Sequence, residues 1–423
     1  MTRIAYGALW LFVFSMPWEA MLIIPGVGLA SRLVGMVAAG LAMIAVLISG
    51  RFRRLHLFHV AAVLFLLWAA CGLFLGHTGE RLPHKFWTYV QLLLFIWMVW
   101  ELAPSRRAQL GLMLAFVLGC YVSVFDTIQL YRNTAELLNR YAVGGGDSND
   151  AAMTLALAIP MAWYIGSVHQ HRVIRLVCRA YLPVAIVALG LTGSRGGMIA
   201  TMVALLIVPL SIHTLSPAKL VSAILVLGLS GALAIAYTPE TLMQRLATTG
   251  TEVTEGGLSG RLKLWKAGLR AFEEEPVMGY GTGYFKNAIT PILGTASQVA
   301  HNSYISLLVE QGVVGWLLYM SMMALVFLNV MALPPPERRF GLILFATLAT
   351  AMLPLTWEDR RAAWFVMSAL LGFATAYRAM PRGGWSPQSH PGVAHAAPHL
   401  AGRPGAPIVG ARRDLGFGSD PSR

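Results

Sequence analysis

The chain has 423 residues, of which 57% are hydrophobic and only 12% are charged. Because soluble domains carry about 25% charged residues, this composition excludes an ordinary soluble protein and indicates an integral membrane protein. The net charge of +13 comes from short Lys and Arg clusters between apolar runs, so we expect a lipid bilayer as a partner and no nucleic acid.

Twelve apolar stretches come close to the length of roughly 20 residues that a helix needs to cross a bilayer. They predict an all-α polytopic membrane helical bundle, and the first stretch lacks a signal-peptide cleavage site, so we expect it to be retained. The predicted spans are residues 4–23, 31–50, 58–76, 86–102, 109–127, 150–168, 180–193, 197–214, 219–237, 303–331, 340–356 and 362–379. The seventh span is short, which predicts that it is tilted, broken or buried against its neighbours.

Cationic residues are concentrated in alternate loops, and this asymmetry predicts which loops are cytoplasmic. The cytoplasmic set contains Arg51, Arg53, Arg54, Arg106, Arg107, Arg172, Arg175, Arg179, Lys219, Arg338 and Arg339. In the opposite set the cations are fewer and are mixed with acids, as in the sequence from Glu358 to Arg361. Both termini are therefore expected inside.

These spans and loops divide the chain into four parts. Residues 1–237 hold transmembrane helices 1–9, and residues 303–380 hold helices 10–12. Between them, residues 238–302 form a mainly helical domain that the orientation places outside. Residues 381–423 are rich in Pro, Gly, Ala and His without apolar periodicity, so we expect a disordered cytoplasmic tail.

Two early features on the predicted outer face are candidates for ligand binding. Lys85, near the outer start of the fourth span, can bind an anionic ligand or serve as an interfacial anchor. The loop 140–150 contains three consecutive glycines that permit close backbone approach. Asp150 can cap the sixth span, and a flexible loop is the alternative interpretation.

A third feature on this face is the sequence Gly193-Ser194-Arg195-Gly196-Gly197, between the seventh and eighth spans. The guanidinium of Arg195 can bind two phosphate oxygens, and Ser194 can cap the following helix. Together they predict an anion site at a helix N-terminus. The alternative is an arginine that reaches the membrane interface beside a tight turn.

Within the outer domain, one apolar stripe recurs at helical spacing. The stripe consists of Leu258, Leu262, Trp265, Leu269 and Phe272. Ser259 can cap this helix and Pro276 ends it, while Lys263, Lys266 and Arg270 project from the other side. The pattern is typical of a helix at a bilayer surface. Arg261, near the edge of the stripe, is a second cation on the outer face.

The tenth span opens with a short polar patch, His301-Asn302-Ser303-Tyr304. A histidine at this place can act as a general base near neutral pH, or it can be an interfacial histidine satisfied by water. Glu310 follows inside the span, where an acid is costly and is usually paired or functional. It can also be a structural partner for another helix.

The chain lacks the motifs of most cofactor and metal sites. It contains no Walker loop, no Gly-x-Ser-x-Gly and no His/Cys set with metal-ligand spacing, so we expect no cofactor and no metal. Its three cysteines have no evident partner: Cys71 and Cys120 lie in apolar runs and Cys178 in a basic loop. They predict buried, unpaired thiols. Two arginines and a histidine on one face suit instead the release of a diphosphate leaving group and the removal of a proton.

At these positions the chain resembles the O-antigen ligase/polymerase superfamily. The resemblance lies in His301–Tyr304 followed by residues 307–315, in Gly193–Gly197, in Ser259-Gly260-Arg261 with Trp265, and in residues 276–281. It covers about 120 residues closely. One departure is Ser148, which stands where the family usually has a proline before the asparagine, so the role of this loop stays open.

The resemblance implies an O-antigen ligase of the bacterial inner membrane with its active site on the periplasmic side. Such an enzyme transfers glycan from undecaprenyl diphosphate to lipid A–core in a metal-independent, inverting displacement. By the resemblance, Arg195 and Arg261 bind the diphosphate and His301 acts near the acceptor hydroxyl. Ser194, Asn302, Tyr304 and Lys85 complete the expected substrate-binding set, and no obligate protein partner is inferred.

Three alternatives remain open from the sequence. An O-antigen polymerase and a protein O-oligosaccharyltransferase share the same superfamily, and the modest outer insertion favours the ligase. A secondary transporter would place ionisable residues at mid-bilayer and repeat its helices in two halves. Glu310 is the one such acid and no repeat is evident, so an enzyme is favoured.

Overall fold

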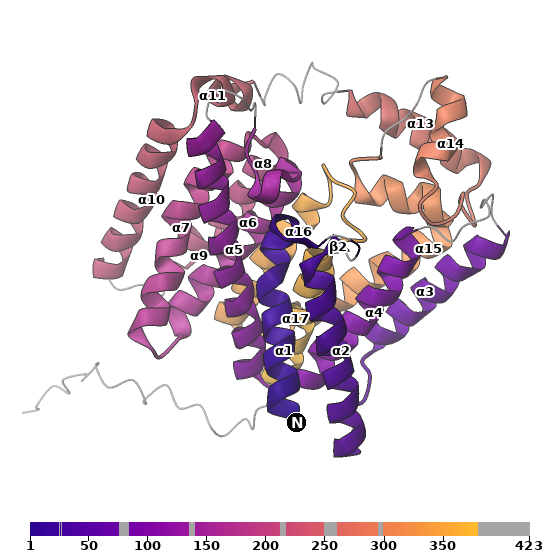
Figure 1. The fold of residues 1–423 in the computed structure, drawn as a ribbon, viewed down its shortest axis with the longest axis horizontal. Helices are drawn as coiled ribbons and strands as arrows, with labels where there is room; N and C mark the ends of the chain where they lie inside the picture. Colours follow the sequence, from indigo (N-terminus) through magenta and orange to yellow (C-terminus); the bar gives the residue numbers. More distant parts are fainter. Residues whose placement is uncertain are drawn as a thin grey trace, which may run out of the picture. The chain divides into compact units, whose positions relative to one another are not determined.

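A computed structural model describes residues 1–24, 26, 28–75, 84–134, 140–211, 217–248, 260–294 and 299–379. In chain order, the first helical segments are α1 (Thr2–Ser15), η1 (Met16–Met21), α2 (Ala30–Ser49), α3 (Leu57–Leu75), α4 (His84–Leu102), α5 (Arg106–Thr134) and η2 (Val143–Gly145). They are followed by α6 (Ser148–Val168), α7 (Arg172–Thr192), α8 (Arg195–Leu205), α9 (Ile207–Leu210), α10 (Pro217–Tyr237) and α11 (Glu240–Ala247). The last helices are α13 (Arg261–Glu274), α14 (Phe285–Leu293), α15 (Ser303–Met331), α16 (Pro335–Ala351) and α17 (Arg361–Arg378). Strands β1 (Ile23–Ile24) and β2 (Gly28–Leu29) pair between α1 and α2 (Figure 1).

The helices confirm an all-α polytopic membrane protein. Six described segments are long and apolar enough to cross a bilayer, by length and composition. They are Thr2–Met21, Ala30–Ser49, Arg106–Thr134, Ser148–Val168, Arg172–Thr192 and Ser303–Met331. Along α2, Met36 and Ile48 are 60% and 67% exposed, and such an apolar surface suits contact with lipid rather than water.

Helix α6 lies at the centre of the bundle. It packs against α5, α7, α8 and α16, and Ala152, Ala156 and Ala158 on it are fully buried. Small side chains let neighbouring backbones approach closely, which is how helices associate in a membrane. The helix begins after Asp147, whose carboxylate caps it by accepting the N–H groups of Asn149 and Asp150. The prediction that Asp150 is the cap was therefore wrong.

Helix α7 is a full-length span and not the short one that we predicted. It begins at Arg172 rather than at residue 180, so Arg175 and Arg179 belong to the helix and not to a loop. Arginine tolerates such a position because its long stem packs on apolar surface while its charge stays in water. Cys178, predicted in a basic loop, is instead buried in this helix. None of the three cysteines forms a disulfide and Cys120 is buried as expected, but Cys71 is exposed, so the prediction of a buried thiol was wrong there.

Helix α15 is broken at Gly312, where φ is 61° and ψ is −173°. The positive φ favours glycine, and a side chain here would collide with the backbone of Val277. Carbonyl groups that lose their helical partners find others: Tyr280 N–H donates to Val309 at 2.8 Å, and Gly281 N–H donates to Glu310 at 2.9 Å. We expected Glu310 well within the span, but it lies in the short helical segment before the break.

Helices α13 and α14 form a small core of their own, beside the start of α15 (Figure 1). Ala267 and Ala271 of α13 pack there with Phe285 and Ile289 of α14 and with Val309 of α15. The helix predicted from the apolar stripe is confirmed as α13, but small residues form its buried face. Leu262 and Leu269 of the stripe are exposed. Ser259, its predicted cap, and the tail 381–423 lie outside the described residues.

Candidate active site

The loop before α6 is joined to the turn between α7 and α8. The side chain of Arg140 donates to Asn149 Oδ1 at 2.7 Å and to the Thr192 carbonyl at 2.9 Å. Ser194 Oγ donates to the same Asn149 oxygen at 2.9 Å. These bonds hold the loop 140–150 in one conformation, whereas the sequence allowed a flexible loop as an alternative. The predicted close backbone approach is confirmed at Gly144, where a side chain would meet the backbone of Ala20.

Arg195 is the first residue of α8. Ser194 caps this helix, as predicted, by accepting the N–H of Gly197 at 3.1 Å. The guanidinium of Arg195 donates to Thr248 Oγ1 at 2.8 Å. The next residue, Gly196, lies against Pro354, because a Cβ atom at Gly196 would be 2.8 Å from the proline ring. The cation therefore sits at a helix N-terminus that touches the loop between α16 and α17.

That same loop holds the turn that carries His301. The backbone N–H of His301 donates to Thr356 Oγ1 at 3.0 Å. Ser303 Oγ donates to the Leu355 carbonyl at 2.8 Å and accepts the N–H of Trp357 at 2.7 Å. The α16–α17 loop thus connects the Arg195 turn with the His301 turn.

His301 adopts a left-handed backbone conformation with a φ of 46°, and no other non-glycine residue in the described part of the chain has a positive φ. Such a conformation is uncommon for residues with a side chain and persists where the surroundings determine it. Asn302 then caps α15 by accepting the N–H groups of Tyr304 and Ile305. The strained turn sets the position of the imidazole just before the helix begins.

The electrostatic surroundings of His301 favour a neutral imidazole. Partial burial lowers its pKa, and the nearby charge of Arg261 lowers it further, whereas the carboxylate of Asp147 opposes them. Arg261 is the first residue of α13, whose Trp265 donates to the Ala300 carbonyl at 2.9 Å. The structure therefore brings Arg261 and Asp147 within electrostatic reach of His301. A neutral imidazole is the form that can accept a proton.

We expect the Asp147→Asn variant to extend the activity of the enzyme to lower pH. Removing the carboxylate lowers the pKa of His301 further, so the imidazole stays neutral in more acidic solution and the acid limb of the pH–rate profile moves down. Asparagine also caps helices well, so α6 should be retained. The profile of the purified variant checks this. Asp126→Asn, which changes a carboxylate bound to Gly144 N–H, is the matched control and should leave the limb in place; an upward shift in Asp147→Asn would contradict the assignment.

Lys85 lies in a buried cluster with two carboxylates. Its ammonium is 2.8 Å from Glu310 Oε2 and 2.6 Å from Glu358 Oε1, and the three side chains are 11%, 5% and 0% exposed. Gly283 N–H also donates to Glu310 at 2.9 Å. Glu310 is therefore a structural partner for another helix, one of the two roles we considered for it. Because the ammonium bonds two carboxylates, Lys85 joins α4 to the first part of α15 and to the loop between α16 and α17.

Replacing Lys85 by methionine should destabilise the protein by about 3–5 kcal/mol, because the change leaves two buried carboxylates without their cation. The midpoint of thermal unfolding in detergent measures the loss. Lys266→Met removes an exposed cation from α13 and should change stability by less than about 0.5 kcal/mol. Equal unfolding midpoints for the Lys85→Met variant and the unmodified protein would show that the cluster does not contribute to stability.

The polar atoms of three other predicted ligands are engaged within the protein. Tyr304 OH donates to the Ala349 carbonyl at 3.1 Å, Asn302 caps α15, and Ser194 caps α8. Their predicted contacts with substrate remain a prediction. The described residues contain no group of three or more His, Cys, Asp or Glu side chains that could hold a metal ion.

Several residues near the site were not singled out from the sequence. Arg360 pairs with Asp150 at 3.0 Å, and Trp357 Nε1 donates to the same carboxylate at 2.8 Å. The available signal was the concentration of charges from Glu358 to Arg361 in a chain that has few charges. Asp147 and Arg140 gave a weaker signal, as charged ends of a glycine loop.

The fold and the site define a multi-pass helical membrane protein with cationic residues and a histidine gathered where several helices begin. Residues 180–320 match the family described as O-antigen ligase. The match confirms the resemblance to the O-antigen ligase/polymerase superfamily over the stretch that contains Arg195, Arg261 and His301. Members of this family are glycosyltransferase-like enzymes. A comparison with curated proteins found no match.

Proposed function

We propose that the protein is an O-antigen ligase that transfers glycan from undecaprenyl diphosphate to lipid A–core. The observation that carries the proposal is the placement of Arg261 within electrostatic reach of a partly buried His301. A cation beside a neutral base is suited to a reaction that releases an anion and consumes a proton on one face. The family match over residues 180–320 supports the same chemistry.

In the proposed reaction, a hydroxyl of the acceptor sugar attacks the anomeric carbon of the donor glycan. The new C–O bond forms as the bond to the diphosphate breaks, and His301 takes the hydroxyl proton. Arg195 and Arg261 neutralise the charge that develops on undecaprenyl diphosphate, and the arginine fork suits two phosphate oxygens at once. A single displacement inverts the anomeric centre.

The proposal requires no metal, because the arginines take the place that a divalent cation has in other diphosphate-releasing enzymes. Transfer by the purified enzyme in excess EDTA tests this part. Activity that is lost with the chelator and restored by one particular divalent ion would overturn it.

The proposal also places the site on the periplasmic side of the inner membrane, with both termini in the cytoplasm. Its support is the cation asymmetry between alternate loops. Cysteine labelling in intact cells tests the orientation at single positions introduced near residues 270 and 170. Labelling of the first from the cytoplasm would overturn the direction of transfer.

A deletion strain tests the ligase against the other members of the superfamily. The ligase proposal expects free lipid A–core together with glycan that remains on its polyprenyl carrier. Lipid A–core with a single attached repeat would indicate a polymerase instead. Normal lipopolysaccharide with loss of glycan from proteins would indicate a protein O-oligosaccharyltransferase.

The transporter alternative differs in what crosses the membrane. It expects a mobile ionisable residue at mid-bilayer, whereas Glu310 is bound to Lys85 and to a backbone N–H group. Transfer of glycan by purified protein in detergent, where no compartments exist, would exclude transport as the main activity.

A further inference from the structure

A second polar site lies at the other ends of the central helices. It is a cavity of about 900 Å³ between the start of α1, the start of α5 and the turn that joins α6 to α7. Asn149 and Ser194 of the candidate active site lie near the start of α6 and the end of α7, whereas the cavity adjoins the end of α6 and the start of α7. Both helices have 21 residues, and each therefore spans about 30 Å. The cavity thus opens at the opposite face of the bilayer.

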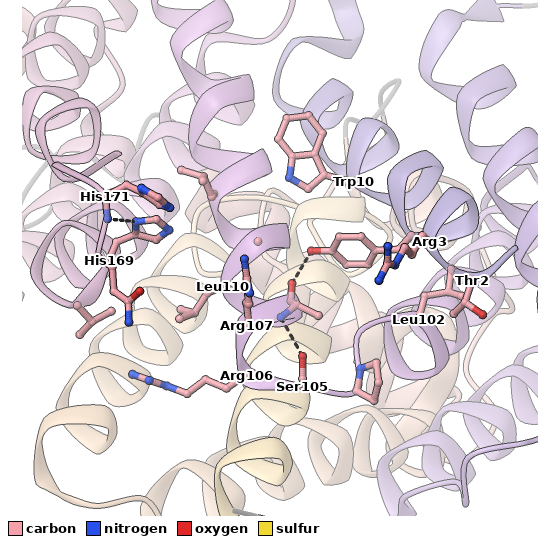
Figure 2. A pocket seen from close by; sticks show the side chains of 17 residues that line it. Thr2, Arg3, Trp10, Leu102, Ser105, Arg106, Arg107, Leu110, His169 and His171 are labelled. Atoms are coloured by element: carbon pink, nitrogen blue, oxygen red, sulfur yellow. Dashed lines mark hydrogen bonds between the residues drawn. The ribbon is translucent and has the colours of Figure 1, made fainter. Parts of the chain in front are cut away.

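The wall of the cavity is cationic. Arg3, Arg107, His169 and His171 line it, and none of the lining residues is an acid (Figure 2). A further lining residue, Arg106, is engaged elsewhere, since it donates to Tyr164 at 2.8 Å and lies 3.8 Å from Glu337. The guanidinium groups of Arg3 and Arg107 are both on exposed residues.

Partial burial and the positive charges around the cavity lower the pKa of one histidine in the turn between α6 and α7. The pKa of His169 is lowered by its partial burial and by the nearby charges of His171 and Arg107. The backbone N–H of His171 donates to His169 Nδ1 at 3.2 Å, which orients the His169 ring in the turn (Figure 2). An anion in the cavity would offset this excess of positive charge.

The remainder of the wall is apolar and belongs to membrane helices. Trp10 of α1, Leu110 and Leu114 of α5 and Val168 of α6 line it. Tyr6 OH donates to the Ala108 carbonyl at 2.8 Å. Cations at a mouth above apolar walls, with a tryptophan and a tyrosine, match the boundary between headgroups and acyl chains.

We propose that this cavity binds an anionic phospholipid, with its phosphate between Arg3 and Arg107 and an acyl chain along Trp10 and Leu114. Basic pockets between membrane helices suit such headgroups. The lipid comes from the leaflet opposite to the candidate active site, so it is distinct from the glycan donor. Its phosphate compensates a wall on which the lining residues supply cations and no carboxylate. The inference stands independently of the reaction that the protein catalyses.

Native mass spectrometry of the full chain, released from detergent with added phosphatidylglycerol or phosphatidylcholine, tests the proposal. The protein should retain phosphatidylglycerol in preference to phosphatidylcholine. Each cation near a membrane surface strengthens binding of an anionic lipid by about fivefold, so the Arg3→Gln/Arg107→Gln double variant should retain it about 30-fold more weakly. Each single variant should retain phosphatidylglycerol about fivefold more weakly. The single variants therefore keep the test valid if the double variant does not fold.

The matched control is the Arg51→Gln/Arg54→Gln double variant. These two exposed arginines lie between α2 and α3, outside the cavity, and their loss should leave the retained phosphatidylglycerol unchanged. An equal decrease in the control would show a general effect of net charge and overturn the site. Equal retention of phosphatidylcholine would also overturn it, as would displacement of the lipid by soluble glycerol phosphate at low millimolar concentration.

Discussion

The His301→Asn variant should transfer glycan about 10²–10⁴-fold more slowly than the unmodified enzyme, which is the usual contribution of a positioned base. Asparagine is the sharper substitution, because it adopts the left-handed conformation of His301 more readily than most residues do. Donor binding should survive, since Arg195 and Arg261 remain. Measuring donor binding and glycan transfer on one purified preparation separates the two effects.

The matched control for this variant is His56→Asn. His56 lies between α2 and α3, away from the residues assigned to the reaction, and its replacement should leave transfer unchanged. His301 is not the base if the His301→Asn variant transfers at the normal rate. A loss of donor binding together with transfer would assign His301 to the donor site instead.

Alanine in place of Arg195 or Arg261 should lower transfer by about 10²–10³-fold, because each removes a positioned cation from the developing charge of the leaving group. Unlike the change at His301, these substitutions should also weaken donor binding. Arg195→Lys should restore only part of the activity, since an ammonium lacks the planar fork that engages two phosphate oxygens. Rates and donor affinities of the purified variants check both expectations.

Arg270→Ala is the control, because Arg270 is exposed on the same helix as Arg261. Its transfer rate should equal that of the unmodified protein. Full restoration by Arg195→Lys would mean that charge alone matters at that position, and normal transfer by either alanine variant would remove that arginine from the site.

Helix positions were predictable where apolar length alone decides them. The predicted span 31–50 is α2 (Ala30–Ser49), and the predicted span 303–331 coincides with α15 (Ser303–Met331). The start of α7 was missed because a hydropathy pattern treats Arg175 and Arg179 as loop residues. Their helical position depends on the water and neighbours that their long side chains can reach, which the local sequence does not reveal.

The break at Gly312 could not be predicted for a related reason. A glycine within an apolar run costs only about 1 kcal/mol relative to alanine, so it does not by itself end a helix. What stabilises the break is a set of distant donors: Tyr280, Gly281 and Trp68, whose indole donates to the Gln311 carbonyl at 2.9 Å.

In the candidate site, too, local features could be predicted from the sequence and long-range contacts could not. The cap by Ser194 is a local pattern and was predicted correctly. The cluster of Lys85, Glu310 and Glu358 joins three segments that are far apart in the sequence. A single sequence contains no information on which cation such acids will meet, so the ion pairs of Lys85 with Glu310 and Glu358 were not predicted.

The break at Gly312 also separates positions where substitutions should affect turnover from positions where they should affect the abundance of the folded protein. Before it, residues 303–311 share contacts with α13 and α14; after it, the chain follows α3 through the bundle. A saturation scan should therefore change in character at this residue. Apart from the paired Glu310, conservative replacements before the break should alter turnover at normal abundance, whereas those after it should alter abundance at normal turnover.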